Sequence, residues 1–198
     1  MVFQQPETQL FEETVGKDVS FSPRRKKLPA ERSRALVESS LQSVGLDYQT
    51  FRLRYVYALS GGQKRRVAIA GILAGEPEVL ILDEPVAGLD PRGRRELAAL
   101  VKHLAHERNL TVILVGNTID ELAELADRAI VMHEGKVVSD GPLLQVLRES
   151  AMLHRIGLEL SEAAEIARLI RQQRPTFPAH FLHIEALCDA ICAFTGAA

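Results

Sequence analysis

The chain has no long apolar run and little net charge. None of its 198 residues belongs to a run of the roughly 20 apolar residues that a helix needs to cross a bilayer, and the start lacks a charged-then-apolar signal segment. A formal net charge of −2 gives no overall attraction to nucleic acid or anionic lipid. We therefore expect a cytoplasmic chain that reaches a membrane only through a partner.

Cysteine is also scarce. The chain has two, Cys188 and Cys192, four residues apart in a helical pattern. This spacing places both on one apolar face of a helix, which favours buried, reduced thiols. A metal site formed with His183 is the alternative interpretation, although two cysteines alone make no metal-binding framework.

A third absence concerns phosphate binding. The sequence nowhere contains Gly-x-x-x-x-Gly-Lys-[Ser/Thr], the loop whose backbone N–H groups cradle nucleotide phosphates. Gly16-Lys17 comes nearest, but Asp18 follows it and Phe11 stands where the first glycine would be. Any phosphate chemistry of this chain must therefore use other residues.

The segment Leu59-Ser60-Gly61-Gly62-Gln63 is the first candidate for that chemistry. It opens a predicted helix that runs towards Ala74, with an apolar stripe of Val67, Ala70 and Leu73. Glycines at a helix start let a phosphate approach the unpaired N–H groups and the positive end of the helix dipole. Taken alone, the same residues could form a simple turn and cap.

The apolar run Val79-Leu80-Ile81-Leu82 is followed by Asp83-Glu84-Pro85. The run is too short for a helix and too continuous for a half-exposed strand, so it predicts a central strand of a parallel sheet. Ligands of such sheets bind at the carboxyl ends of the strands, where Asp83 and Glu84 emerge. The first carboxylate suits Mg²⁺, and the second can orient or deprotonate a water. A structural N-cap is a plausible alternative for Asp90 before Pro91, but not for this pair.

The rest of the pattern predicts an α/β fold. We expect a loop at Ser22–Pro29 with four adjacent cations, and a helix from Ala30 that ends at Gly45. Alternating helices and strands continue to a hairpin that turns at Glu134-Gly135. The remaining expected elements are a helix through Leu97 and Leu104, a strand at Leu110–Val115, a helix near Asp120–Ala126, and two C-terminal helices at Glu162–Ile170 and Ile184–Ile191.

Four segments now stand in a characteristic order: Val2-Phe3-Gln4, Leu59 to Gln63, Leu80 to Pro85, and Ala87-Gly88-Leu89-Asp90. Over roughly residues 1–145 this order resembles that of ATP-binding cassette (ABC) ATPases. Within that superfamily, the segment Phe3–Val15 is similar to the ATPase subunits of energy-coupling factor (ECF) transporters, which import vitamins and transition-metal ions. Ile156-Gly157-Leu158 and the helices after it are similar to the extra domain of those subunits.

The resemblance implies a fold and a domain division. The fold would be a partial P-loop NTPase-type parallel sheet core with a helical subdomain and a small C-terminal helical appendage. Residues 1–147 would form a partial ABC ATPase domain, with the helical subdomain at about 12–75 and the Walker B half of the core at 76–147. Residues 148–198 would form the C-terminal helical domain. The phosphate-binding loop would lie upstream of Gln4, and Met1 would be an internal methionine of a longer protein.

The resemblance also implies roles for single residues. Gln4 would be the Q-loop glutamine that senses Mg²⁺ and the attacking water, Asp83 the Walker B ligand of Mg²⁺, and Glu84 the catalytic base. Asn117 stands at the place of the switch histidine; an amide can hydrogen-bond a γ-phosphate but cannot titrate. His133 lies on the following hairpin, and we interpret it as a strand-end histidine.

Some residues would serve the partner's nucleotide, because ABC ATPases close as head-to-tail dimers around two ATP molecules. These residues are Ser60, Gly61, Gly62, Gln63 and, in the D-loop, Asp90. The expected partners are a second ABC ATPase subunit, in a homodimer or heterodimer, a transmembrane coupling subunit and a substrate-binding membrane subunit, with no nucleic acid. The chain would lie on the cytoplasmic face of the membrane.

Three functions remain open from the sequence. The first is the ATP-hydrolysing subunit of such an importer, with ATP and Mg²⁺ as cofactors. The second is a short, non-hydrolysing regulatory subunit that lends its Ser-Gly-Gly to a partner. The third is an ABC ATPase without a transporter, although the acidic charge balance and the single set of motifs argue against it.

Overall fold

The structure is a computed structural model. It describes residues 1–3, 6–107, 109–117, 122, 125–158, 162–178, 181 and 184–195. The chain divides into two compact units, Met1–Val115 and Gly116–Ala198. The proposed domain boundary between residues 147 and 148 stays a prediction.

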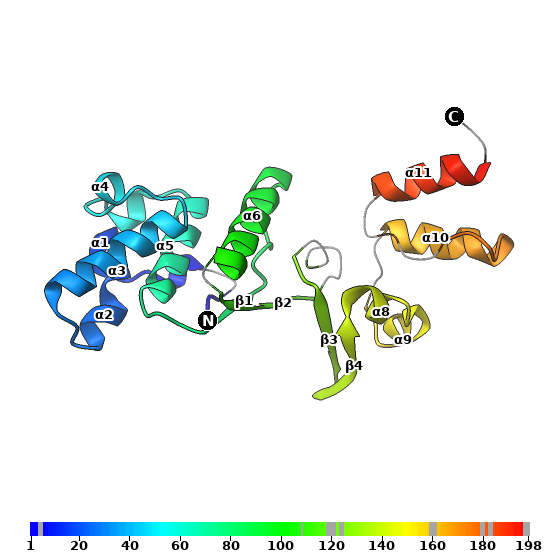
Figure 1. Cartoon of the computed structure of the whole chain (residues 1–198), viewed down its shortest axis with the longest axis horizontal. Coiled ribbons are helices and arrows are strands. Elements are labelled where there is room, and N and C mark those ends of the chain that lie inside the picture. Colours follow the sequence, from blue (N-terminus) through cyan, green and yellow to red (C-terminus); the bar gives the residue numbers. More distant parts are fainter. Residues whose placement is uncertain are drawn as a thin grey trace. The chain divides into compact units, whose positions relative to one another are not determined.

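The first unit begins with a helical region built around two helices, α3 and α5. Helix α3 (Ala30–Ser43) buries Val37 and Leu41 on one face and ends before Gly45, whose φ of +72° suits glycine at a helix terminus. Helix α5 (Gly61–Leu73) packs beside it, as Figure 1 shows. The smaller helices of this region are η1 (Pro6–Gln9), α1 (Val15–Val19), α2 (Phe21–Arg25), α4 (Tyr48–Phe51) and η2 (Val56–Ala58).

The apolar stripe predicted for α5 is confirmed, because Val67, Ala70 and Leu73 are all buried. The buried Asp18 on α1 accepts hydrogen bonds from the backbone N–H groups of Phe11 and Glu12, both at 3.0 Å. Burial raises the pKa of the Asp18 carboxyl, and the two backbone hydrogen bonds oppose that rise. This contact fixes the loop that leads into the helical region.

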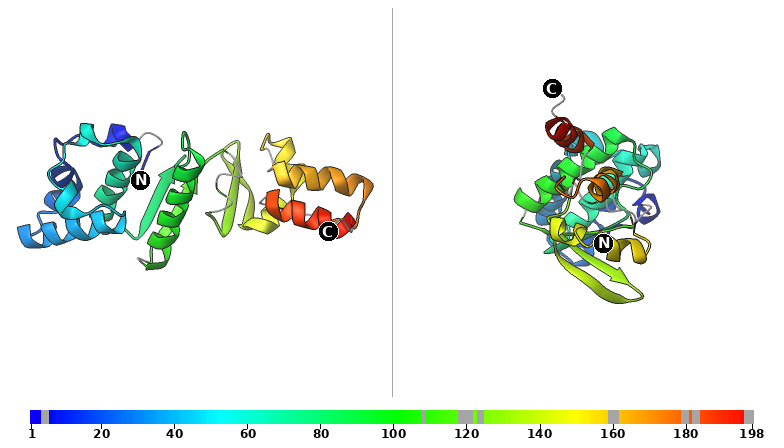
Figure 2. Two further views of the ribbon diagram at one scale, coloured as in Figure 1. Left: turned by 90° about the horizontal axis from the view of Figure 1, so that it is seen from above. Right: turned by 90° about the vertical axis from the view of Figure 1, so that its right-hand side faces the viewer.

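A small parallel sheet follows α5. Strand β1 (Val79–Asp83) pairs in parallel with β2 (Thr111–Val115), in a register that places Leu82 beside Leu114. On its other side β1 is bridged by Val2, whose N–H donates to the Ile81 carbonyl at 2.8 Å. The prediction of a central, parallel strand is therefore confirmed. Helix α6 (Pro91–Glu107) connects the two strands and packs along β2 (Figure 2).

The second unit contains a hairpin and a set of helices. Strands β3 (Arg128–His133) and β4 (Lys136–Pro142) pair antiparallel around Glu134 and Gly135, whose φ values of 48° and 75° are those of a tight hairpin turn. Val131 packs with residues of α8 (Leu143–Leu147) and α9 (Ser150–Arg155). Helices α10 (Glu162–Gln173) and α11 (Ile184–Thr195) lie side by side over a second small core that includes Phe177 and Leu187 (Figure 1). The hairpin and both C-terminal helices agree with the sequence analysis.

Two expectations from the sequence are wrong. The segment from Ser22 to Pro29 is not a loop throughout, because α2 covers its first part and buries Pro23. Proline fits there because the first turn of a helix needs no N–H donor from it. Cys188 and Cys192 are exposed on α11 rather than buried, because the buried face of that helix is the one that carries Leu187. His183 and most of the helix expected at Asp120–Ala126 lie outside the described residues.

Candidate functional site

The start of α5 is built by its own sequence. Ser60 is the N-cap: its hydroxyl accepts the Gln63 N–H at 3.3 Å, and the Gln63 side chain accepts the Ser60 N–H at 3.1 Å. This reciprocal capping box fixes the first turn while leaving it exposed. A Cβ added to Gly61 or Gly62 would meet no atom within 4 Å. The helix start is therefore ordered, open to solvent and shaped to receive an anion.

No acidic side chain lies in the first turn of α5, and three cations follow it. Arg65 reaches the turn after β1, where its guanidinium donates to the carbonyls of Pro85 at 2.7 Å and Ala87 at 3.4 Å. Arg66 instead pairs with Glu96 on α6 at 2.7 Å. Adjacent cations on α5 thus have different structural partners.

Asp83 and Glu84 lie at the carboxyl end of β1, and both are half-buried. The Glu84 N–H donates to the Val115 carbonyl at 2.8 Å, which extends the parallel pairing by one residue beyond β1. Glu84 has a φ of +42°, in the left-handed region that costs a side chain about 1–2 kcal/mol. The carboxylate is therefore held in a strained turn, as is typical of functional sites.

A small cavity joins this turn to α5. It is close to the smallest size that can hold one water molecule. Arg65 and Ile69 from α5 line it together with Asp83 and Pro85. Val2, Phe3, Leu82 and Leu97 complete the lining, so the cavity lies between the end of β1 and α5 and is mostly apolar.

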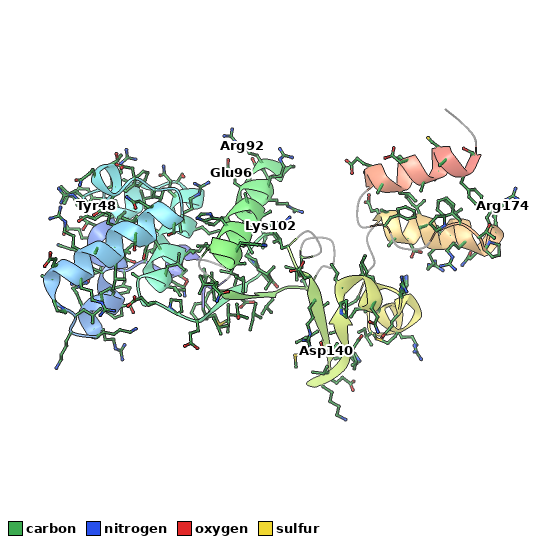
Figure 3. All side chains as sticks on the ribbon, viewed as in Figure 1. Tyr48, Arg92, Glu96, Lys102, Asp140 and Arg174 are labelled. Atoms are coloured by element: carbon green, nitrogen blue, oxygen red, sulfur yellow. The ribbon has the colours of Figure 1, made fainter. Side chains whose placement is uncertain are left out.

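Asp90 begins α6. Its carboxylate accepts the Gly93 N–H at 2.7 Å, and its carbonyl accepts the Arg94 N–H at 3.0 Å. Asp90 is exposed and caps the helix, as the structural alternative predicted. Its role across a dimer interface stays a prediction. Arg92 and Glu96, which form an ion pair of 3.0 Å, lie on the same helix (Figure 3).

Two further residues of the predicted site are Gln4 and Asn117. Gln4 lies outside the described residues. Asn117 is exposed, two residues after β2 in the sequence, and belongs to the second unit. His133 is the last residue of β3, as expected for a strand-end histidine. The sequence analysis does not predict that Arg65 contacts the turn after β1. A cation near the start of a helix gives no sign of which distant residues it will contact.

The part of the chain that the structure describes contains neither a cluster of metal-ligating side chains nor a membrane-spanning helix. Within it, no three His, Cys, Asp or Glu side chains gather into a possible metal site. None of the helices described is long and apolar enough to span a membrane. The candidate site described above consists of the carboxylates Asp83 and Glu84 and the open start of α5.

Comparison with known proteins identifies relatives of the chain. The family model described as ABC transporter matches residues 1–87. The energy-coupling factor transporter ATP-binding protein EcfA2 of Clostridium perfringens is 46% identical over 173 residues, which are 87% of this chain and 61% of that protein. EcfA1 of Caldanaerobacter subterraneus is 43% identical over 193 residues, which are 97% of this chain and 68% of that protein. The chain thus spans about three fifths of the clostridial relative.

The chain is also similar to a solved structure of an ABC transporter protein. The structure of cbiO1 from Clostridium perfringens, described as part of the ABC transporter complex cbiONQ, matches with a TM-score of 0.69 and 39% identity. The match covers 86% of this chain and 66% of that one. The expected P-loop NTPase-type fold of ABC ATPases is therefore confirmed. By fold and by sequence, this chain belongs to the family of energy-coupling factor transporter ATP-binding proteins, which are ABC ATPases.

Proposed function

We propose that the chain is an ATP-hydrolysing subunit of an energy-coupling factor importer. The observation that carries this proposal is the pair Asp83–Glu84 at the carboxyl end of a parallel strand, in a turn tied to α5 by Arg65. Ligands of open α/β sheets bind at this end of the strands. The names of the related proteins support the same function.

The two carboxylates have separate roles in this proposal. Asp83 would hold Mg²⁺, and its donor chemistry fits because Mg²⁺ is usually bound by one or two carboxylates, waters and substrate phosphates rather than by a dedicated cage. When bound, Mg²⁺ neutralises charge on the phosphates. Glu84 accepts a proton from the attacking water and orients it. Gln4 and Asn117 would contact the water and the γ-phosphate from the same subunit.

The start of α5 serves the nucleotide of the neighbouring ATPase subunit. Its exposed N–H groups and the Ser60 hydroxyl donate to a γ-phosphate, and the open space at Gly61 and Gly62 lets that phosphate approach. Gln63 holds this turn in shape through the capping box, and Asp90 presents the D-loop at the same interface. Each site of the dimer would therefore use residues of both subunits.

The further assignments rest on the relatives. The partners would be a second ABC ATPase subunit, a transmembrane coupling subunit and a substrate-binding membrane subunit, on the cytoplasmic face of the membrane. The solute would be a vitamin or a transition-metal ion, selected by the membrane subunit. Residues 1–147 would act as the partial ATPase domain, and residues 148–198 as a C-terminal helical domain.

The test is ATP hydrolysis by the chain assembled with a second ATPase subunit and the membrane subunits in lipid vesicles. Glu84→Gln should lower kcat by about 10²–10⁴-fold with little change in KM, as expected for loss of a general base. Glu78→Gln, at an exposed residue just before β1, is the matched control and should leave kcat unchanged. If Glu84→Gln retains full hydrolysis while Ser60→Arg abolishes it, the regulatory function replaces the one proposed.

A further inference from the structure

Arg65 connects two parts of the candidate site that are distant in the sequence. It lies on α5, five residues after the N-cap Ser60, which is about 7.5 Å along the helix axis. Its guanidinium donates to the Pro85 carbonyl at 2.7 Å and the Ala87 carbonyl at 3.4 Å. Both acceptors belong to the turn that starts at Glu84.

This turn needs an external support. Within it, the Ala87 N–H donates to the Glu84 carbonyl at 3.2 Å, and the Leu89 N–H donates to the Val86 carbonyl at 3.1 Å. The turn also keeps Glu84 in the left-handed region, with a φ of +42°. Such a conformation persists only where surrounding contacts determine it. Arg65 supplies such contacts from another element, as charge-assisted hydrogen bonds from a planar fork.

We propose that Arg65 is a positioning residue, through which α5 sets the conformation of the turn that carries Glu84. The proposal rests on the proposed function, because it assigns Glu84 a place in catalysis. Ser60 and Arg65 lie on one continuous helix, so a displacement of the helix start is passed to the carbonyls of Pro85 and Ala87. Binding of a phosphate at the start of α5 would then favour one orientation of Glu84. A misplacement of about 1 Å at a catalytic group is enough to slow a reaction strongly.

The neighbouring Arg66 provides a matched comparison. It is half-buried on the same helix, but its guanidinium donates to Glu96 at 2.7 Å and reaches the Val44 carbonyl at 3.5 Å. Neither acceptor belongs to the turn after β1. Loss of Arg66 therefore removes a half-buried arginine of α5 without removing a hydrogen bond to that turn.

The first experiment is amide hydrogen exchange on the full chain, read at the residues Glu84 to Leu89. Arg65→Met keeps the apolar stem of the side chain and removes its donors, so exchange in this segment should rise at least tenfold. Arg65→Lys, which restores one donor group, should give a smaller rise, and Arg66→Met should stay within twofold of the wild type. The amides of Leu80 and Leu82 serve as an internal reference for the folded sheet. A segment that exchanges at the wild-type rate in Arg65→Met would overturn the proposal.

The second experiment is the kinetics of the assembled transporter. Arg65→Met should lower kcat for ATP hydrolysis at least tenfold and leave KM within twofold, and Arg65→Lys should recover part of the loss. A rise in KM at unchanged kcat would contradict a positioning role. If the wild-type assembly hydrolyses no ATP, the proposed function fails, while the exchange experiment still decides whether Arg65 holds the turn.

Discussion

Helices α5 and α6 begin alike but leave different space around their first turns. Both have a polar N-cap, Ser60 and Asp90, whose side chain accepts the N–H three residues on. Neither has an acidic residue in the first turn. At α5 a Cβ on Gly62 would meet nothing within 4 Å, whereas at α6 a Cβ on Gly93 would lie 3.0 Å from the Asp90 carboxylate.

This difference separates a helix start that is only capped from one that also has room for a ligand. At α6 the carboxylate of the cap itself fills the space in front of the N–H groups. At α5 the smaller hydroxyl satisfies one N–H and leaves the glycines uncovered. The two helix starts therefore differ in the space in front of their N–H groups because of the cap side chain and the crowding around one glycine.

The largest expected effect on ATP hydrolysis comes from replacing Gly62 of α5 by alanine, and it is compared with the same change at Gly93 of α6. Gly62→Ala should lower ATP hydrolysis of the assembled protein at least tenfold, because the added methyl stands where a phosphate approaches. The same change should raise the free energy of unfolding by up to about 1 kcal/mol, since alanine is the better helix former and finds open space.

Gly93→Ala should show the opposite pattern. Its methyl would crowd the Asp90 carboxylate and the Leu89 side chain, so the free energy of unfolding should fall while hydrolysis changes less than about threefold. Urea unfolding and phosphate release on the same preparations measure both quantities. Wild-type hydrolysis by Gly62→Ala would remove the distinction between the two helix starts.

A smaller effect should come from the caps themselves. Asp90→Ala should cost about 1 kcal/mol of stability, and Ser60→Ala less, because the Asp90 bond is shorter and charged. Moreover, Ser60→Ala leaves the bond from the Ser60 N–H to the Gln63 side chain in place. Urea unfolding at neutral pH measures both costs, with Asp90→Ser as the variant expected to restore most of the loss. Equal costs would mean that the capping box adds nothing beyond the serine hydroxyl.

The smallest effect concerns α10, whose first turn is acidic and so contrasts with both helices above. The side-chain hydrogen bond from Arg168 is the largest cause that lowers the pKa of Glu165, to about 2, with a further hydrogen bond from His154. A lowered pKa contributes stability above pH 4.5 that is lost as the pH falls towards about 2. The stability difference between wild type and Glu165→Gln should therefore be smaller at pH 3 than at pH 6, by urea unfolding. In an Arg168→Met background this pH dependence should become weaker.

Much of this fold follows from local patterns. The stripe of Val67, Ala70 and Leu73 predicts α5, and the apolar run that ends at Asp83 predicts β1, because burial of one face or of a whole strand leaves a clear periodicity. The hairpin follows from Glu134-Gly135, because a tight turn between two strands favours residues that tolerate positive φ. The candidate site residues Asp83, Glu84 and the Ser-Gly-Gly segment are proposed from the order of the motifs, and their roles stay predictions.

What the sequence left hidden depends on contacts between distant segments. The φ of Glu84 and the two carbonyl partners of Arg65 are features of the folded chain, because Arg65 on α5 meets a turn about 20 residues later in the sequence. The short α2 is held by tertiary packing around Pro23, which a local pattern does not report. The exposure of Cys188 depends on which face of α11 meets α10, and a helix with apolar residues on several sides leaves that choice open.

The left-handed backbone at Glu84 also has a consequence for directed evolution. Glycine or asparagine would adopt this conformation more easily than glutamate, so a library screened only for thermal tolerance should enrich those residues at position 84. A library screened for turnover should keep the carboxylate. If the two screens select different residues at position 84, the glutamate there lowers thermal stability but is needed for turnover.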